Sequence, residues 1–148
     1  MFNTSLEQWT WISGNKTADE EGIYGEKGIP SPGNYPGARH DSGSWIDSED
    51  NLWLFGGEGF SESGSEYLND LWLFNTSSEL WTWVNGSKTT TVNGVYGTGI
   101  PAIGNYPGSR KMMGSWIDSN DSLWLFGGDG FPSSGPNDLL NDLWKFYI

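Results

Sequence analysis

The side chains that could carry chemistry in this sequence are few, and they recur in pairs. Arg39 and Arg110 each end a Tyr-Pro-Gly-Ala/Ser-Arg segment. A guanidinium can bind a carboxylate or a sugar through parallel hydrogen bonds, or it can tie its loop to carbonyl groups or to an Asp. Tyr35 and Tyr106 stand just before them, and aromatic rings in such loops can stack on sugars or pack the loop against the protein. We take these four residues as candidate ligand-binding residues, with the structural role as the favoured alternative.

Nucleophilic and transition-metal chemistry lacks its residues. The sequence has 1 His, His40, and no Cys, so a catalytic triad, a thiolate nucleophile and a zinc site are excluded. The segment Asp118–Ser122 alternates oxygen ligands, but it lacks the Gly and the distal Glu of a calcium loop and fits a hairpin turn equally well. No acid/base pair stands out. We therefore expect no catalytic residue, no metal and no cofactor.

Composition narrows the class of protein further. The 148 residues carry 19 acidic and 7 basic side chains, a formal charge of −12 that repels phosphate backbones, so we expect no nucleic-acid partner. Aromatic residues make up 16%, including 10 Trp, which argues against an acidic disordered chain. The 22 Gly and 7 Pro favour short strands over long helices. We expect no membrane span, because no apolar run is long enough, and no signal peptide in Met1–Ser5.

The elements that would position these residues come from an internal repeat. Six segments occur twice in the same order, 71 or 72 residues apart. They are Phe2–Ser5 and Phe74–Ser77, Trp9–Ile12 and Trp81–Val84, Asn34–Arg39 and Asn105–Arg110, Gly43–Ser48 and Gly114–Ser119, Leu52–Gly57 and Leu123–Gly128, and Leu68–Trp72 and Leu140–Trp144.

Each period predicts four strands. Leu52–Phe55 and Leu71–Phe74 are apolar on both faces, as in buried central strands, and Gly56-Gly57 is predicted to end the first of them. Trp81–Val84 alternates, with both Trp on one face, and Ser44–Asp47 leads through a polar turn into the Gly-Gly strand. Two Asp residues that follow Asn are expected to cap turns before a strand, namely Asp70 and Asp142.

The ordered set of motifs resembles the kelch repeat, the four-stranded blade of one class of β-propeller. The resemblance rests on Pro-x-x-Arg, a strand ending in Gly-Gly, Asn-Asp-Leu with an aromatic, and a Trp strand, and it covers nearly the whole sequence. Two features depart from the family: Phe74 and Phe146 stand where Tyr is typical, and the period exceeds the roughly 50 residues usual for kelch. The additional residues form long loops, Gly14–Tyr35 and Gly86–Tyr106, which we expect to be ordered on one face.

The resemblance implies an all-β fold of four-stranded antiparallel blades, two blade equivalents per chain. In the family's strand order a to d, residues 7–13 form a strand d, residues 41–85 a complete a-b-c-d blade, and residues 112–148 an a-b-c blade. Propellers close with about 4 to 8 blades, so we expect completion by other chains. We predict a homo-oligomer in which the first strand of one chain completes the last sheet of the next, head to tail. Three chains with six blades are favoured over four chains or two. The interface residues would be Trp9, Trp11, Leu143, Trp144 and Phe146.

These features favour a non-enzymatic structural or interaction module that presents its Gly/Pro-rich loops to a protein or glycan ligand. The alternatives are a piece of a larger kelch propeller or repeat array, including a sugar-acting enzyme, and an open filament of the same units. Kelch proteins include copper radical oxidases resembling galactose oxidase, but that chemistry needs His and Tyr ligands and a Cys crosslinked to Tyr, and this sequence has His40 alone and no Cys.

Five Asn-x-Ser/Thr sequons exceed the chance expectation of about 2, and they favour an extracellular location with N-glycans. The sequons are at Asn3, Asn15, Asn75, Asn85 and Asn120.

Overall fold

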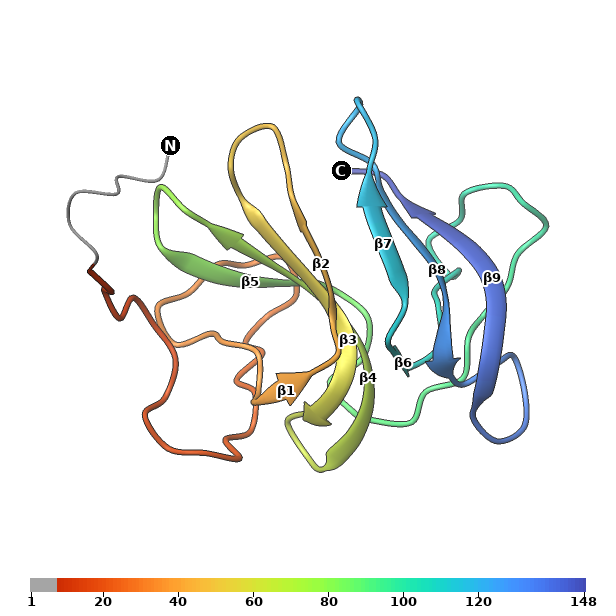
Figure 1. The fold of residues 1–148 in the computed structure, drawn as a ribbon, viewed down its shortest axis with the longest axis horizontal. Helices are drawn as coiled ribbons and strands as arrows, with labels where there is room; N and C mark the ends of the chain where they lie inside the picture. Colours follow the sequence, from red (N-terminus) through yellow and green to blue (C-terminus); the bar gives the residue numbers. More distant parts are fainter. Residues whose placement is uncertain (1–7) are drawn as a thin grey trace.

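The structure, a computed structural model, describes residues 8–148 as an all-β protein with two antiparallel sheets side by side (Figure 1). This part of the chain contains no helix, and so none that could span a membrane. The two sheets are built from the two sequence repeats, and the connection 86–109 leads from the first to the second.

The first sheet contains five strands, of which two very short ones share an edge. Its strands are β1 (Arg39–His40), β2 (Gly43–Ile46), β3 (Leu52–Phe60), β4 (Ser65–Asn75) and β5 (Leu80–Asn85). Strands β1 and β2 both pair with β3, followed by β4 and then β5 at the other edge. Strand β4 is therefore paired on both sides.

The second sheet repeats this pattern without its last strand. It contains β6 (Arg110–Lys111), β7 (Gly114–Ile117), β8 (Leu123–Gly130) and β9 (Asp138–Phe146). Strands β6 and β7 pair with β8, and β8 pairs with β9. Strand β9 occupies the place of β4, but no described strand pairs with its outer edge.

The prediction that Gly56-Gly57 ends its strand is wrong. Strand β3 continues to Phe60 through a bulge, since the register with β4 shifts between Phe55 and Gly57. Both glycines have positive φ, +60° and +93°, which L side chains rarely adopt. A Cβ on Gly56 would also lie 2.8 Å from the carbonyl oxygen of Arg110. The glycines thus bend the strand and let the sheets approach each other.

The predicted polar hairpin turn before β3 is confirmed. The Asp47 carboxylate accepts hydrogen bonds from the backbone N–H of Glu49 and Asn51 and from the Trp53 indole. Burial pushes the pKa of Asp47 upward, but these bonds outweigh it and hold the pKa below its usual value. The carboxylate therefore fixes both the turn and a core Trp.

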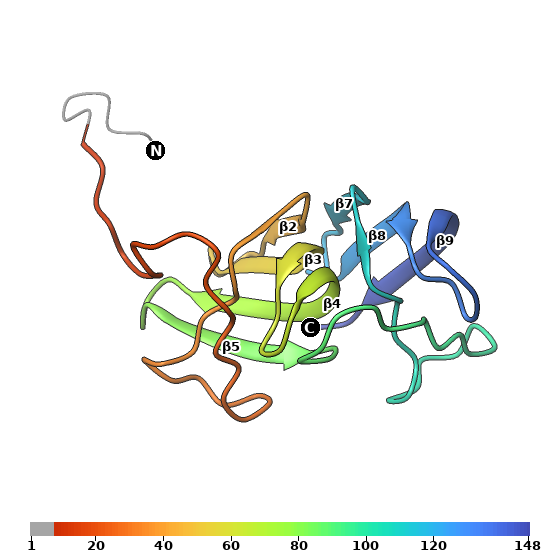
Figure 2. The same ribbon diagram turned by 90° about the horizontal axis from the view of Figure 1, so that it is seen from below.

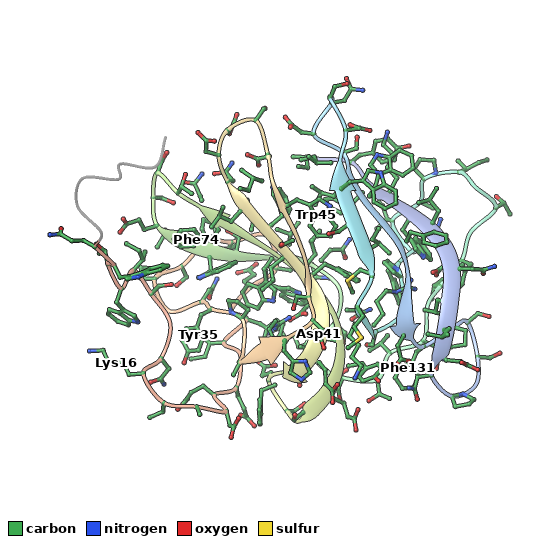
Figure 3. All side chains as sticks on the ribbon, viewed as in Figure 1. Lys16, Tyr35, Asp41, Trp45, Phe74 and Phe131 are labelled. Carbon is green, nitrogen blue, oxygen red and sulfur yellow. The ribbon has the colours of Figure 1, made fainter. Side chains whose placement is uncertain are left out.

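The main core lies between the two sheets. From the first sheet it receives Trp45, Phe55 and Leu71, which pack against Leu123 and Leu125 of the second. Figure 3 shows Trp45 in the space between the sheets, where its indole N–H bonds to carbonyl groups on β7 and β8. The sheets are thus held by apolar burial and by directed hydrogen bonds.

The two long loops lie below the sheets in an ordered arrangement (Figure 2). Each loop is closed on itself by a short backbone bridge, Ile23 with Tyr35 in the first and Val95 with Tyr106 in the second. The first loop also bonds to β5 through the Trp81 and Trp83 carbonyls.

Candidate functional site

A buried ion pair organises the outer half of the first sheet. Arg39 reaches from β1 to Asp70 in the interior of β4, with two hydrogen bonds of 2.6 and 2.8 Å. The same guanidinium donates to the Gly37 and Gly56 carbonyls. Burial lowers the pKa of Arg39, but the charge of Asp70 outweighs this effect and the pKa is raised. The guanidinium therefore remains charged.

Two further side chains complete the cluster around Asp70. The Tyr24 hydroxyl donates to this carboxylate over 2.6 Å and the Trp72 indole over 2.7 Å. Burial, followed by the charge of Asp70, raises the pKa of Tyr24, which keeps the phenol as a donor. The prediction that Asp70 caps a turn is wrong, because its side chain is the centre of a buried cluster inside a strand.

The second repeat contains the same cluster. Arg110 bonds to Asp142 over 2.6 and 2.8 Å, and Tyr96 and Trp144 donate to the same carboxylate over 2.6 and 2.7 Å. Asp142, like its counterpart, lies inside a strand, so the expectation of a turn cap is wrong here too. The signal that could have indicated the cluster is that Arg, Asp and Tyr each recur at equivalent positions of the two repeats.

The four candidate ligand-binding residues lie mainly within the protein. The Arg39 and Arg110 side chains are 6% and 0% exposed, and both are engaged with carbonyls and Asp. Tyr35 and Tyr106 are half-buried and anchored by backbone bonds across their loops. The structure thus places all four in structural contacts, and ligand binding by them stays a prediction.

The two clusters differ in one respect, namely what covers them. Tyr24 is 0% exposed, whereas its counterpart Tyr96 is 43% exposed. Leu71 on β4 is 4% exposed, and its counterpart Leu143 on β9 is 56% exposed. The inner contacts of the two clusters are alike, so the difference in exposure comes from their surroundings.

Strand β5 covers the first cluster. Its Trp83 packs on Tyr24 with ring centroids 5.5 Å apart, and its Trp81 packs on Phe74 at 5.0 Å and on Trp72 at 6.3 Å. These aromatic contacts bury the clustered rings on the face of β4.

The first loop holds the other edge of β5. Gly28 N–H donates to the Trp83 carbonyl over 2.9 Å, and Ser31 N–H to the Trp81 carbonyl over 3.4 Å. Strand β5 is therefore inserted between β4 on one side and loop backbone on the other.

The equivalent position in the second sheet is an open groove of about 870 Å³. Its walls are β9, with Asp142 to Phe146, and the loop 96–105, and it is also lined by Lys27 of the first loop and by Val84 and Asn85 at the end of β5. Tyr96 and Trp144, packed together with centroids 5.0 Å apart, line the groove. Aromatic rings, a free strand edge and loop backbone thus surround a space of the kind that β5 fills in the first sheet.

The predicted interface residues lie at two distant places. Residues 8–13 form no strand within the chain, and Trp9 and Trp11 are exposed. They lie beyond β5, whereas β9 with Leu143 lies at the opposite end of the molecule (Figure 2). The chain therefore does not bring its own segment 8–13 to its own groove. Residue 7, the first of the predicted strand, lies outside the described residues.

The sequons occupy varied positions, and their glycosylation stays a prediction. Asn15 is exposed in an irregular segment and Asn120 in a turn, and Asn75 and Asn85 are half-buried at strand ends. Asn3 lies outside the described residues. The Asp118 carboxylate of the calcium-like segment bonds to backbone N–H groups and to an indole, as in the equivalent turn. Within residues 8–148, no group of three or more metal-ligating side chains comes together.

No protein-family model matches this chain, and no curated protein matches it.

Proposed function

We propose that this protein is a non-enzymatic structural module that assembles with copies of itself, through a strand passed from each copy to the next. Residues 8–13 of one copy enter the groove beside β9 of another and complete its second sheet. The observation that carries this proposal is the groove itself, which has the walls of the β5 site and lacks its strand.

The register follows from β4 and β5. In that pair Trp72 stands opposite Trp83 and Phe74 opposite Trp81. If the second sheet uses the same register, Trp11 of the entering strand stands opposite Trp144, and Trp9 stands opposite Phe146. Trp11 then packs on Tyr96 as Trp83 packs on Tyr24, which covers the exposed ring.

The second loop offers matching backbone donors. Gly99 and Ala102 stand at the positions of Gly28 and Ser31, which donate to the carbonyls of β5. Both residues belong to the groove wall. The entering strand would be bonded on both edges, as strand addition requires for affinity.

The assembly would be head to tail, because residues 8–13 and strand β9 lie toward opposite ends of one molecule (Figure 2). Such contacts close into a ring or continue as a filament. We favour a ring of three copies, a six-bladed kelch-type propeller, since two blade equivalents per copy then reach the usual range of about 4 to 8. Its long loops would present a surface to a protein or glycan ligand.

The test is the oligomeric state of the protein, measured by native mass spectrometry and light scattering. We expect a trimer at micromolar concentration and a monomer for the double variant Trp9→Ala/Trp11→Ala. Truncation of a buried Trp costs about 3–5 kcal/mol, so each substitution should weaken the contact by at least about 100-fold.

Ile23→Ala is the matched control, because Ile23 and its counterpart Val95 are both exposed. It should remain trimeric. A wild-type protein that stays monomeric at micromolar concentration contradicts the proposal, and an unchanged oligomer in the double variant shows that the Trp strand does not cross between copies.

A further inference from the structure

The contact between the two sheets uses one face of each. The front face of the first sheet, defined by Trp45, Phe55 and Leu71, is buried against the back face of the second, defined by Met113, Leu123 and Leu125. Side chains alternate along a strand, so each sheet has both faces. The repeat provides each sheet with equivalents of most of these residues, except that Ser42 stands in the first repeat where the second has Met113.

The unused faces expose these equivalent residues. Trp116, Phe126 and Leu143 form the front face of the second sheet. Trp45 is 6% exposed, whereas Trp116 at the equivalent position is 48% exposed.

The back face of the first sheet carries Leu52 and Leu54 at the positions of Leu123 and Leu125. Leu52 is exposed and Leu54 is half-buried, whereas both counterparts are buried. One chain thus presents two exposed faces. The front face of the second sheet corresponds to the buried front face of the first sheet, and the back face of the first sheet corresponds to the buried back face of the second.

We infer that these two faces dock on each other in successive copies, with the front face of one second sheet on the back face of the next first sheet. The inference rests on the proposed self-assembly and adds a second, separate interface to it. The occupant of each face is a second copy of this chain, because the same chain already contains the complementary face in contact.

Directed polar contacts support the match. Within the chain, the Trp45 indole donates to the Trp116 carbonyl over 2.8 Å and to the Trp124 carbonyl over 3.2 Å. At the equivalent positions, the Trp116 indole would donate to the carbonyls of Trp45 and Trp53 in the next copy. Strands β2 and β3 of the next copy carry these carbonyls.

A second polar contact joins the hairpin turns. Ser48 donates through its backbone N–H and its hydroxyl to the Asp121 carboxylate, at 3.0 and 2.5 Å. The counterparts are Ser119 and Asp50, and Asp50 has the same positive φ as Asp121, +62° against +60°. The turn backbone thus already holds the acceptor in the geometry that the contact uses.

The experiment compares Trp116→Glu, Trp116→Phe and Ile23→Glu by sedimentation over a range of concentrations. Trp116→Glu places a charge in the docked face and should abolish the closed oligomer. Trp116→Phe keeps an aromatic ring but loses the indole donor, so the dissociation constant should rise roughly 2- to 12-fold. Ile23 and its counterpart Val95 are both exposed, so Ile23→Glu should leave the dissociation constant unchanged.

A peptide of residues 6–14, titrated into Trp116→Glu, separates this inference from strand exchange. The face contact is supported if Trp116→Glu loses the oligomer and still binds the peptide as tightly as Trp9→Ala/Trp11→Ala does. Oligomers of unchanged stability in both Trp116 variants overturn it. A peptide that binds neither protein overturns strand exchange, and the face contact is then judged by Trp116→Glu against Ile23→Glu alone.

Discussion

Replacing Asp70 by Asn tests the view that the buried cluster fixes the first sheet. The carboxylate is fully buried and receives two bonds from Arg39 and one each from Tyr24 and Trp72. An Asn side chain has similar size but no charge, and one of its two polar ends is a donor. The substitution therefore leaves a guanidinium that is 6% exposed without its counter-charge.

The expected cost is a loss of about 3–5 kcal/mol in the free energy of unfolding, the range for breaking a buried ion pair from one side. This is a large fraction of the roughly 5–15 kcal/mol that stabilises a typical domain. The equivalent Asp142→Asn should cost about 1–3 kcal/mol while the groove is empty, because water reaches the cluster beside Tyr96.

The assay is urea unfolding followed by near-ultraviolet circular dichroism, with both substitutions placed in the Trp9→Ala/Trp11→Ala background so that the groove stays empty. A cost below about 1 kcal/mol for Asp70→Asn would contradict a stabilising role of the buried ion pair, and so would equal costs for the two substitutions. Equal costs would mean that cover by β5 has no influence on the ion pair.

Two further predictions concern acid and a pair of glycines. Burial pushes the pKa of Asp142 upward, but hydrogen bonds led by that from Arg110 lower it to about 2. The stabilisation from this group is then complete above about pH 4 and is lost as the pH falls through 2, so the urea midpoint of Asp142→Asn should fall less steeply with acid than that of the wild type. Gly86→Ala should destabilise the fold by about 1–3 kcal/mol in urea unfolding, because φ is +81° and the Cβ would lie 2.0 Å from the Asn69 carbonyl oxygen. Its counterpart Gly14 has no atom within 4 Å of an added Cβ, so Gly14→Ala should lower the free energy of unfolding of the isolated chain less than Gly86→Ala does. It should instead weaken the oligomer in light scattering. Equal unfolding costs for the two substitutions would contradict this prediction.

The sequence predicts the strands of the two sheets well because each carries a local signal, whereas residues 8–13, with the same Trp pattern as β5, form no strand within the chain. The alternation of Trp81–Val84, the apolar run Leu71–Phe74 and the polar turn after Asp47 all correspond to elements of the structure. These signals depend on neighbours within a few residues, so a single sequence contains them.

The clusters and the bulges depend on distant residues, and the sequence does not predict them. Asp70 follows Asn and resembles a turn cap, but its partners Arg39 and Tyr24 lie 31 and 46 residues away. Gly56-Gly57 likewise resembles a strand end in the sequence. The Arg110 carbonyl of the other sheet lies beside Gly56 only in the folded protein, so this reason for the glycine is not visible in the sequence. Pairing across such separations becomes visible only when the strands are placed.

The contrast between Trp9, wholly in solvent, and Trp72, wholly enclosed, gives the molecule an optical consequence. Indoles in water emit at longer wavelength and are accessible to quenchers, whereas enclosed indoles are not. Any event that covers Trp9 and Trp11 would shift their emission toward shorter wavelength, while the enclosed indoles provide a constant background. In the Trp116→Phe variant, which lacks the other exposed indole of the docked faces, the protein therefore reports the environment of residues 8–13 without a label, at concentrations well below those needed to weigh its complexes.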